Sequence, residues 1–199
     1  MLAHLNCANS TKGVVSSHLR TGQVFKTSSE GQQDDLWICL SPSCDMVPGQ
    51  KTSGWYGRVG EFLPFVAVEL ESCKLETALN SASQNIHLFL RIENDVKAFT
   101  FHPNGNLHAS PSWEQMFAAN QGQFADGTKA FTVHRCAATA GGLVTQSTQA
   151  TVVGQLRYEY ALNLLQRLSG VFSRVGLDFK ASASSHPTKS AKSGQGSGT

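Results

Sequence analysis

The amino-acid sequence predicts a single α+β domain, in which a mostly antiparallel or mixed β-sheet of about five to seven strands packs on one long C-terminal helix. The sheet can take a barrel-like form. Short apolar or alternating runs separated by turn residues indicate the strands. One long amphipathic stretch near the C-terminus indicates the helix. A chain of 199 residues is long enough to bury a core of its own.

Six segments have the pattern of strands. The clearest is residues 36–40 (LWICL), a continuous apolar run that predicts a central strand covered on both faces. Residues 87–92 and 96–101 lie on either side of a three-residue polar segment, which predicts a hairpin. The remaining strands are expected at residues 23–27, 62–70 and 129–136.

Three segments are expected to be helical. Residues 148–172 carry the longest helical pattern, with a broad apolar arc and a narrow polar stripe that includes Gln155. Shorter helical segments are expected at residues 75–83 and 113–119. A closing strand is expected at residues 177–179, just after the long helix.

Arg157 falls near the middle of the apolar arc of the long helix. An isolated buried charge is very costly, so we expect its guanidinium to meet a carboxylate, unless the side chain snorkels to water near the helix start. Asp45, which follows the central strand, is the first candidate, and Asp178 is the second. Such a pair would anchor the strand to the helix or hold a ligand at a pocket floor.

Composition changes along the chain give the domain boundaries. Residues 1–18 are poorly patterned, residues 19–180 form the α+β domain, and residues 181–199 are a tail rich in Ser, Gly and Lys. We expect the tail to be disordered, because it cannot bury enough apolar surface to offset the entropy of ordering. No secretory leader pattern and no run of 18 apolar residues is present, so a cytoplasmic location without membrane association is expected.

Charge, cysteines and motifs restrict the classes of function. The net charge of +2 at pH 7 is too small by itself to indicate binding to nucleic acid or to an anionic membrane. The five cysteines are an odd number at irregular spacing, so reduced thiols are expected rather than a disulfide framework or a metal site. No phosphate-binding loop and no nucleophile elbow occurs. No metal and no cofactor is therefore expected.

Four segments occur in an order that resembles the C-terminal domain of atypical bacterial response-regulator proteins: GQVF (22–25), LWICLSPSCD (36–45), QLRYEYALNLL (155–165) and SRVGLDF (173–179). In that family the domain follows a receiver domain, in two-component-like loci associated with phage defence. The resemblance implies a non-enzymatic regulatory or protein-interaction domain of a signalling or defence system, with a signalling or effector protein as its partner. Only 36 residues precede Trp37, too few for a receiver domain, so we expect a stand-alone or truncated version.

An enzyme is the first alternative to that role. Cys44 and Asp45 follow the end of the buried strand, a place where open α/β sheets commonly bind ligands. A small-barrel nuclease or another hydrolase would act from this rim. A nucleophilic thiol requires a nearby cation, however, and the Asp45 carboxylate disfavours the thiolate, so a structural turn at Cys44 is the preferred interpretation.

A nucleic-acid-binding module is the second alternative. In the expected loop at residues 48–60, Trp55 and Tyr56 lie between Lys51 and Arg58. Basic and aromatic side chains together are typical of surfaces that bind single strands by stacking on bases. A solvated loop with a partly packed tryptophan has the same composition, so the pattern leaves the choice between these functions open.

Overall fold

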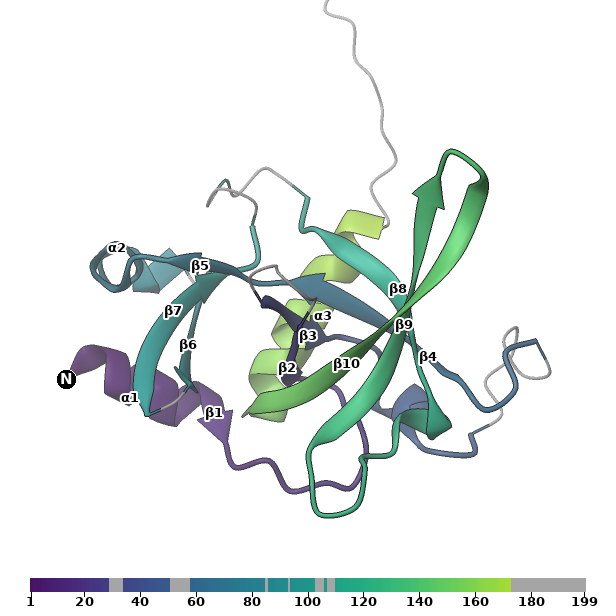
Figure 1. The fold of residues 1–199 in the computed structure, drawn as a ribbon. Helices are drawn as coiled ribbons and strands as arrows, with labels where there is room; N and C mark the ends of the chain where they lie inside the picture. Colours follow the sequence, from purple (N-terminus) through teal and green to yellow (C-terminus); the bar gives the residue numbers. More distant parts are fainter. Residues whose placement is uncertain are drawn as a thin grey trace, which may run out of the picture.

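The computed structural model describes residues 1–28, 34–50, 58–84, 86–92, 94–102, 106 and 110–172. Its central feature is a closed, six-stranded antiparallel barrel (Figure 1). The strands pair in the order β10-β2-β3-β4-β8-β9, and β9 pairs back with β10, so the predicted antiparallel sheet is closed into a barrel. The strands are β2 (Gln23–Thr27), β3 (Asp35–Cys39), β4 (Leu63–Glu69), β8 (Trp113–Ala118), β9 (Ala130–Thr139) and β10 (Gly142–Leu156).

A smaller antiparallel sheet lies beside the barrel (Figure 1). Its strands are β5 (Glu71–Cys73), β7 (Asp95–Thr100) and β6 (His87–Ile92), in that order. β6 and β7 form the predicted hairpin. The helix α2 (Leu75–Asn80) lies within the segment expected to be helical. The described residues also include the short 3-10 helices η1 (Ser43–Met46), η2 (Ala82–Gln84) and η4 (Asn120–Gly122).

β3 is buried on both faces, as its continuous apolar run predicted. Trp37 and Cys39 belong to a cluster inside the barrel that draws side chains from all six strands. Ile38 belongs to a second cluster on the outer face, together with residues of β6, β7 and the helix α3 (Tyr158–Phe172). Successive side chains of a strand point to opposite faces, so a strand that is apolar at every position requires cover on both sides.

Two segments that were expected to be helical are strands. Residues 113–118 form β8, and the expected long helix begins at Tyr158 instead of residue 148. Residues 148–156 belong to β10, which pairs first with β9 and then with β2. This segment is rich in threonine and valine, whose β-branched side chains fit a sheet better than a helix. The apolar periodicity of α3 therefore does not extend as far toward the N-terminus as expected.

The N-terminal residues, expected to be poorly patterned, form α1 (Leu2–Ser10) and β1 (Thr11–Lys12). α1 packs through Ala3 and Cys7 on the smaller sheet and α2. β1 pairs with the end of β10 and so lies beside the barrel. The contacts of α1 are made by small side chains, which give little helical periodicity in the sequence.

Gly22 sets the distance between the start of β2 and α3. Its φ is +80°, in the left-handed region that favours glycine. A Cβ at this position would lie 2.7 Å from the Cβ of Ala161 in α3. The turn that carries Arg20 and Thr21 is therefore held close against the first turns of α3.

Two expectations lie outside the described residues: the strand at residues 177–179 and the tail at residues 181–199. Within the described part of the chain, none of the helices combines the length and the apolar character that crossing a membrane would require.

The start of α3 packs on the outer face of the barrel. Three of its residues (Ala161, Leu164 and Leu168) are buried in the second cluster.

Candidate functional site

Arg157 is exposed, so the expectation of a buried guanidinium in the helix is wrong. The residue precedes α3, and its backbone N–H donates to the Ser10 carbonyl at 2.8 Å, while Nη2 donates to the Ala8 carbonyl at 3.5 Å. Among the described residues, no ion pair joins Arg157 to Asp45. The second candidate, Asp178, lies outside the described residues.

Cys44 and Asp45 lie in η1, immediately after the barrel strand β3. Cys44 is exposed, and its thiol donates to the Asp45 carboxylate at 3.4 Å. Of the loop residues expected to contact nucleic acid, Lys51, Trp55 and Tyr56 lie outside the described residues, and Arg58 is exposed. The described members of these two sets, Cys44, Asp45 and Arg58, do not line the cavity described next.

The segment between β1 and β2 forms the first wall of that cavity. Leu19 is completely buried, and its N–H donates to a carbonyl of η4 at 2.8 Å. Gln23 is also completely buried: its Oε1 accepts from the Arg20 N–H at 2.8 Å, and its Nε2 donates to Ser16 Oγ at 2.7 Å. These contacts fix the backbone on both sides of His18, so the basic side chains of this loop start from defined positions.

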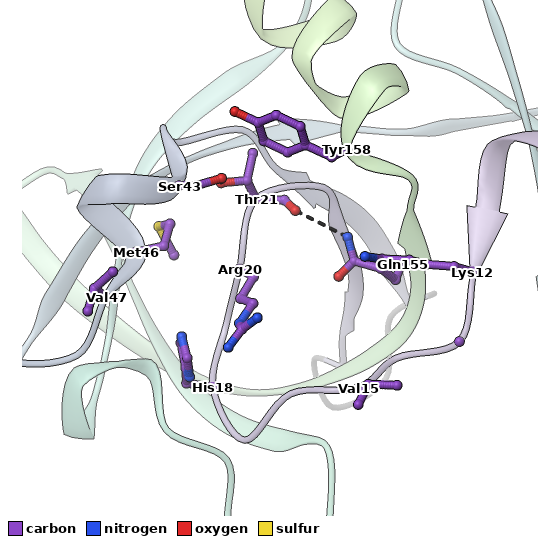
Figure 2. Close-up of a pocket in the computed structure, with 11 residues that line it drawn as sticks. Lys12, Val15, His18, Arg20, Thr21, Ser43, Met46, Val47, Gln155 and Tyr158 are labelled. Carbon is purple, nitrogen blue, oxygen red and sulfur yellow. Dashed lines mark hydrogen bonds between the residues drawn. The ribbon is translucent and has the colours of Figure 1, made fainter.

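Thr21, η1 and the beginning of α3 form the second wall. Thr21 Oγ1 donates to the Ser41 carbonyl at 2.6 Å, and Ser43 Oγ donates to Thr21 Oγ1 at 3.1 Å. Gln155 Nε2 donates to the Thr21 carbonyl at 3.2 Å and so connects this turn to β10. Figure 2 shows Tyr158 beside Ser43 and Thr21, at the rim of the cavity.

These walls surround an open cavity of about 450 Å³ (Figure 2), a volume within the usual range of ligand pockets. Figure 2 shows Met46 and Val47 on one side and Lys12 on the other, with the loop that bears His18 and Arg20 between them. The described lining residues include three with basic side chains and none with a carboxylate: Lys12, Gly13, Val15, His18, Arg20, Thr21, Ser43, Met46, Val47, Gln155 and Tyr158. We refer to this cavity as the basic pocket.

The three basic side chains of the basic pocket have no ion-pair partner among the described residues. By contrast, Lys26, on β2, is paired with Asp34 at 3.2 Å. Burial lowers the pKa of His18 below its ordinary value, and the charge of Arg20 lowers it further. An anion in the pocket would compensate this repulsion, so the arrangement suits a negatively charged ligand.

The basic pocket was missed in the sequence because its residues lie in the poorly patterned N-terminal segment. One signal was present: the first 29 residues contain Lys12, Arg20 and Lys26 but no aspartate or glutamate. The contributions of Ser43 and Tyr158 come from distant parts of the chain and have no signature in the local sequence. Only the fold brings them to the same cavity.

Comparisons with protein-family models, with curated proteins and with solved structures give no match to this chain. Within the described residues, no three His, Cys, Asp or Glu side chains are grouped so that they could hold a metal ion. The function is therefore inferred from the chemistry of the pocket and from the residues themselves.

Proposed function

We propose that this protein is a non-enzymatic binding domain whose ligand presents an anionic group, a phosphate or a carboxylate, to the basic pocket. The observation that carries this proposal is the presence of Lys12, His18 and Arg20 around one cavity that has no carboxylate among its described lining residues. A concave site lined by charges of one sign focuses the field and concentrates ligands of the opposite sign. A binding role agrees with the regulatory or interaction domain of a bacterial signalling or defence system that the sequence resemblance implies.

The walls of the pocket support binding rather than catalysis. Lys12 and Arg20 are exposed and can move onto a ligand, whereas the backbone beneath them is held by the buried Gln23 and Gln155. The hydroxyl of Tyr158 at the rim adds a neutral donor. Charge-assisted hydrogen bonds from such groups are the usual way in which proteins hold phosphate and carboxylate.

The enzyme alternative is weaker at the residues where it was expected. The thiol of Cys44 donates to the Asp45 carboxylate, whereas a nucleophilic thiol is activated by a nearby cation or a general base. The contacts of Cys44 in the described chain include no histidine that could act as a base. A hydrolase acting from this rim therefore has less support than a binding site in the basic pocket.

The test is a titration of ¹⁵N-labelled protein with sulfate, which keeps its double negative charge across the working pH range. We expect shifts in the amide resonances of residues 12–21, 43–47 and 155–158, and an affinity that falls at least about fivefold in Arg20→Ala and in Lys12→Ala, because each variant lacks a charge-assisted hydrogen bond. Lys97→Ala is the control, because Lys97 is exposed on β7 and lines no part of the pocket. Shifts elsewhere only, or equal affinity in all variants, would overturn the proposal.

A further inference from the structure

A second basic cavity lies next to the basic pocket and shares one of its walls. It measures about 520 Å³, and the two cavities have Lys12, Gly13 and Gln155 in common. β1 and the residue that follows it therefore separate the two cavities, with the Lys12 side chain able to serve both. The inference drawn from this arrangement rests on the proposed function and concerns the class of ligand.

The second cavity has the same charge character as the first. Arg91 at the end of β6 and Lys129 just before β9 line it together with Lys12, and none of its described lining residues is acidic. Arg91 and Lys129 are exposed and have no ion-pair partner among the described residues. The guanidinium of Arg157 adds to this field, since it contacts the carbonyl of Ala8, another lining residue.

The two cavities adjoin at Lys12, Gly13 and Gln155 and take their basic side chains from four separate parts of the fold. These basic residues are Lys12, His18, Arg20, Arg91 and Lys129. The whole protein has a net charge of only +2, so this is a local concentration of charge and not a consequence of a basic composition. A single phosphate or carboxylate would occupy one cavity and leave the other empty.

We propose that the ligand is single-stranded nucleic acid, with successive phosphates in the two cavities and the backbone passing over Lys12 and Gly13. A flexible single strand can follow a bent path through two pockets, whereas a duplex is stiff over this length. Tyr158 is 51% exposed at the rim of the basic pocket, where its ring can stack on a base. Basic side chains that follow the backbone, combined with an exposed aromatic ring, are the two elements of sequence-tolerant single-strand binding.

The experiment is fluorescence anisotropy with a labelled eight-nucleotide oligo(dT) and oligo(U) over a range of salt concentrations. We expect the double variant Arg91→Ala/Lys129→Ala and the single variant Arg20→Ala each to bind at least about threefold more weakly at low salt. The slope of log affinity against log salt should fall by about 0.7 for each phosphate that the variant no longer neutralises. Tyr158→Leu should weaken binding about fivefold or more without changing the salt slope. Lys74→Ala and Lys97→Ala, at exposed positions outside both cavities, are the matched controls.

The outcomes separate this inference from the proposed function. If sulfate binds in the basic pocket but the oligonucleotides bind no more tightly than sulfate, or if Arg91→Ala/Lys129→Ala has no effect on them, the nucleic-acid inference is wrong and the anion site stands. Equal binding of polyglutamate, of anionic lipid vesicles or of a duplex of the same sequence would also overturn it, because the surface would then recognise charge alone. If neither sulfate nor oligonucleotide binds, both proposals fail.

Discussion

The side-chain amide of Gln155 donates hydrogen bonds to the carbonyl oxygens of Thr21, at 3.2 Å, and of Leu156, at 2.8 Å. Gln155 lies near the end of β10, and Thr21 lies in the turn before β2. The amide is buried, so these bonds are protected from competition with water. The wall of the basic pocket is thus tied to the strand pairing that closes the barrel.

Replacing Gln155 by methionine tests this connection. Methionine has a similar shape but donates no hydrogen bond, so Gln155→Met should lower the free energy of unfolding by about 1–3 kcal/mol, the cost of leaving buried polar groups unpaired. Urea denaturation measures the change. Gln149→Met is the control, because the Gln149 side chain is exposed and its bond to Thr132 Oγ1 competes with water. Equal effects of the two substitutions would contradict the structural role of Gln155.

Gly22→Ala should be strongly destabilising, by about 2–4 kcal/mol, because it adds left-handed backbone strain to a clash with Ala161. Gly49 has almost the same φ, +77°, but no atom of the described residues lies within 4 Å of its Cβ position. Gly49→Ala should therefore cost only the backbone strain, about 1 kcal/mol. Chemical denaturation of both variants measures the two changes in the free energy of unfolding. Equal decreases would show that the contact with α3 does not restrict position 22.

Sulfate affinity should depend on pH through His18. In the free protein the pKa of His18 lies below 6.5, because burial and the charge of Arg20 disfavour the imidazolium. A bound anion favours the imidazolium, so binding raises this pKa and takes up a proton. Affinity should therefore rise as the pH falls through the pKa of His18 in the complex and level off below its lower pKa in the free protein. Calorimetric titration at several pH values measures this, and His18→Gln should remove most of the dependence; an unchanged profile in that variant would refute the assignment.

Cys39 should resist alkylation in the native protein. Its side chain is completely buried in the barrel, and burial raises the pKa of its thiol to about 12. Cys44 and Cys136 are exposed and serve as internal references. Mass spectrometry after treatment with iodoacetamide should find both of them modified well before Cys39. Modification of all three at similar rates would mean that the barrel opens readily.

The strands were predictable where burial determines the sequence pattern. The continuous apolar run around Ile38 identified a strand covered on both faces, because each residue of that run contacts a hydrophobic cluster or lies beside one. The segment around Met116 was expected to be a helical turn. It is short and mixes apolar and polar residues, so its periodicity does not distinguish a helix from a strand. Val152 falls within the predicted helix for a different reason: β10 continues almost directly into α3, with no glycine or proline break between Gln155 and Tyr158.

The candidate site was much less predictable than the sheet. The expected burial of Arg157 depended on the helix starting at residue 148, so the error in the boundary placed an exposed residue in the core. The basic pocket combines Lys12, Arg20 and Tyr158, and these residues come together only because β1 and β2 both pair with β10. Such long-range pairing leaves no periodic trace in the local sequence.

The closure of the barrel by β10 has a consequence for synthesis on the ribosome. β2 can pair with β3 soon after both are synthesised. The other edge of β2 stays unpaired until β10 is made, because Gln23 lies opposite Gln155. At usual rates of translation this delay is on the order of 10 s. Throughout that interval the nascent chain presents an unpaired edge of the kind that recruits strands from other chains. The order of the strands thus sets how long this edge stays unpaired in each newly made molecule.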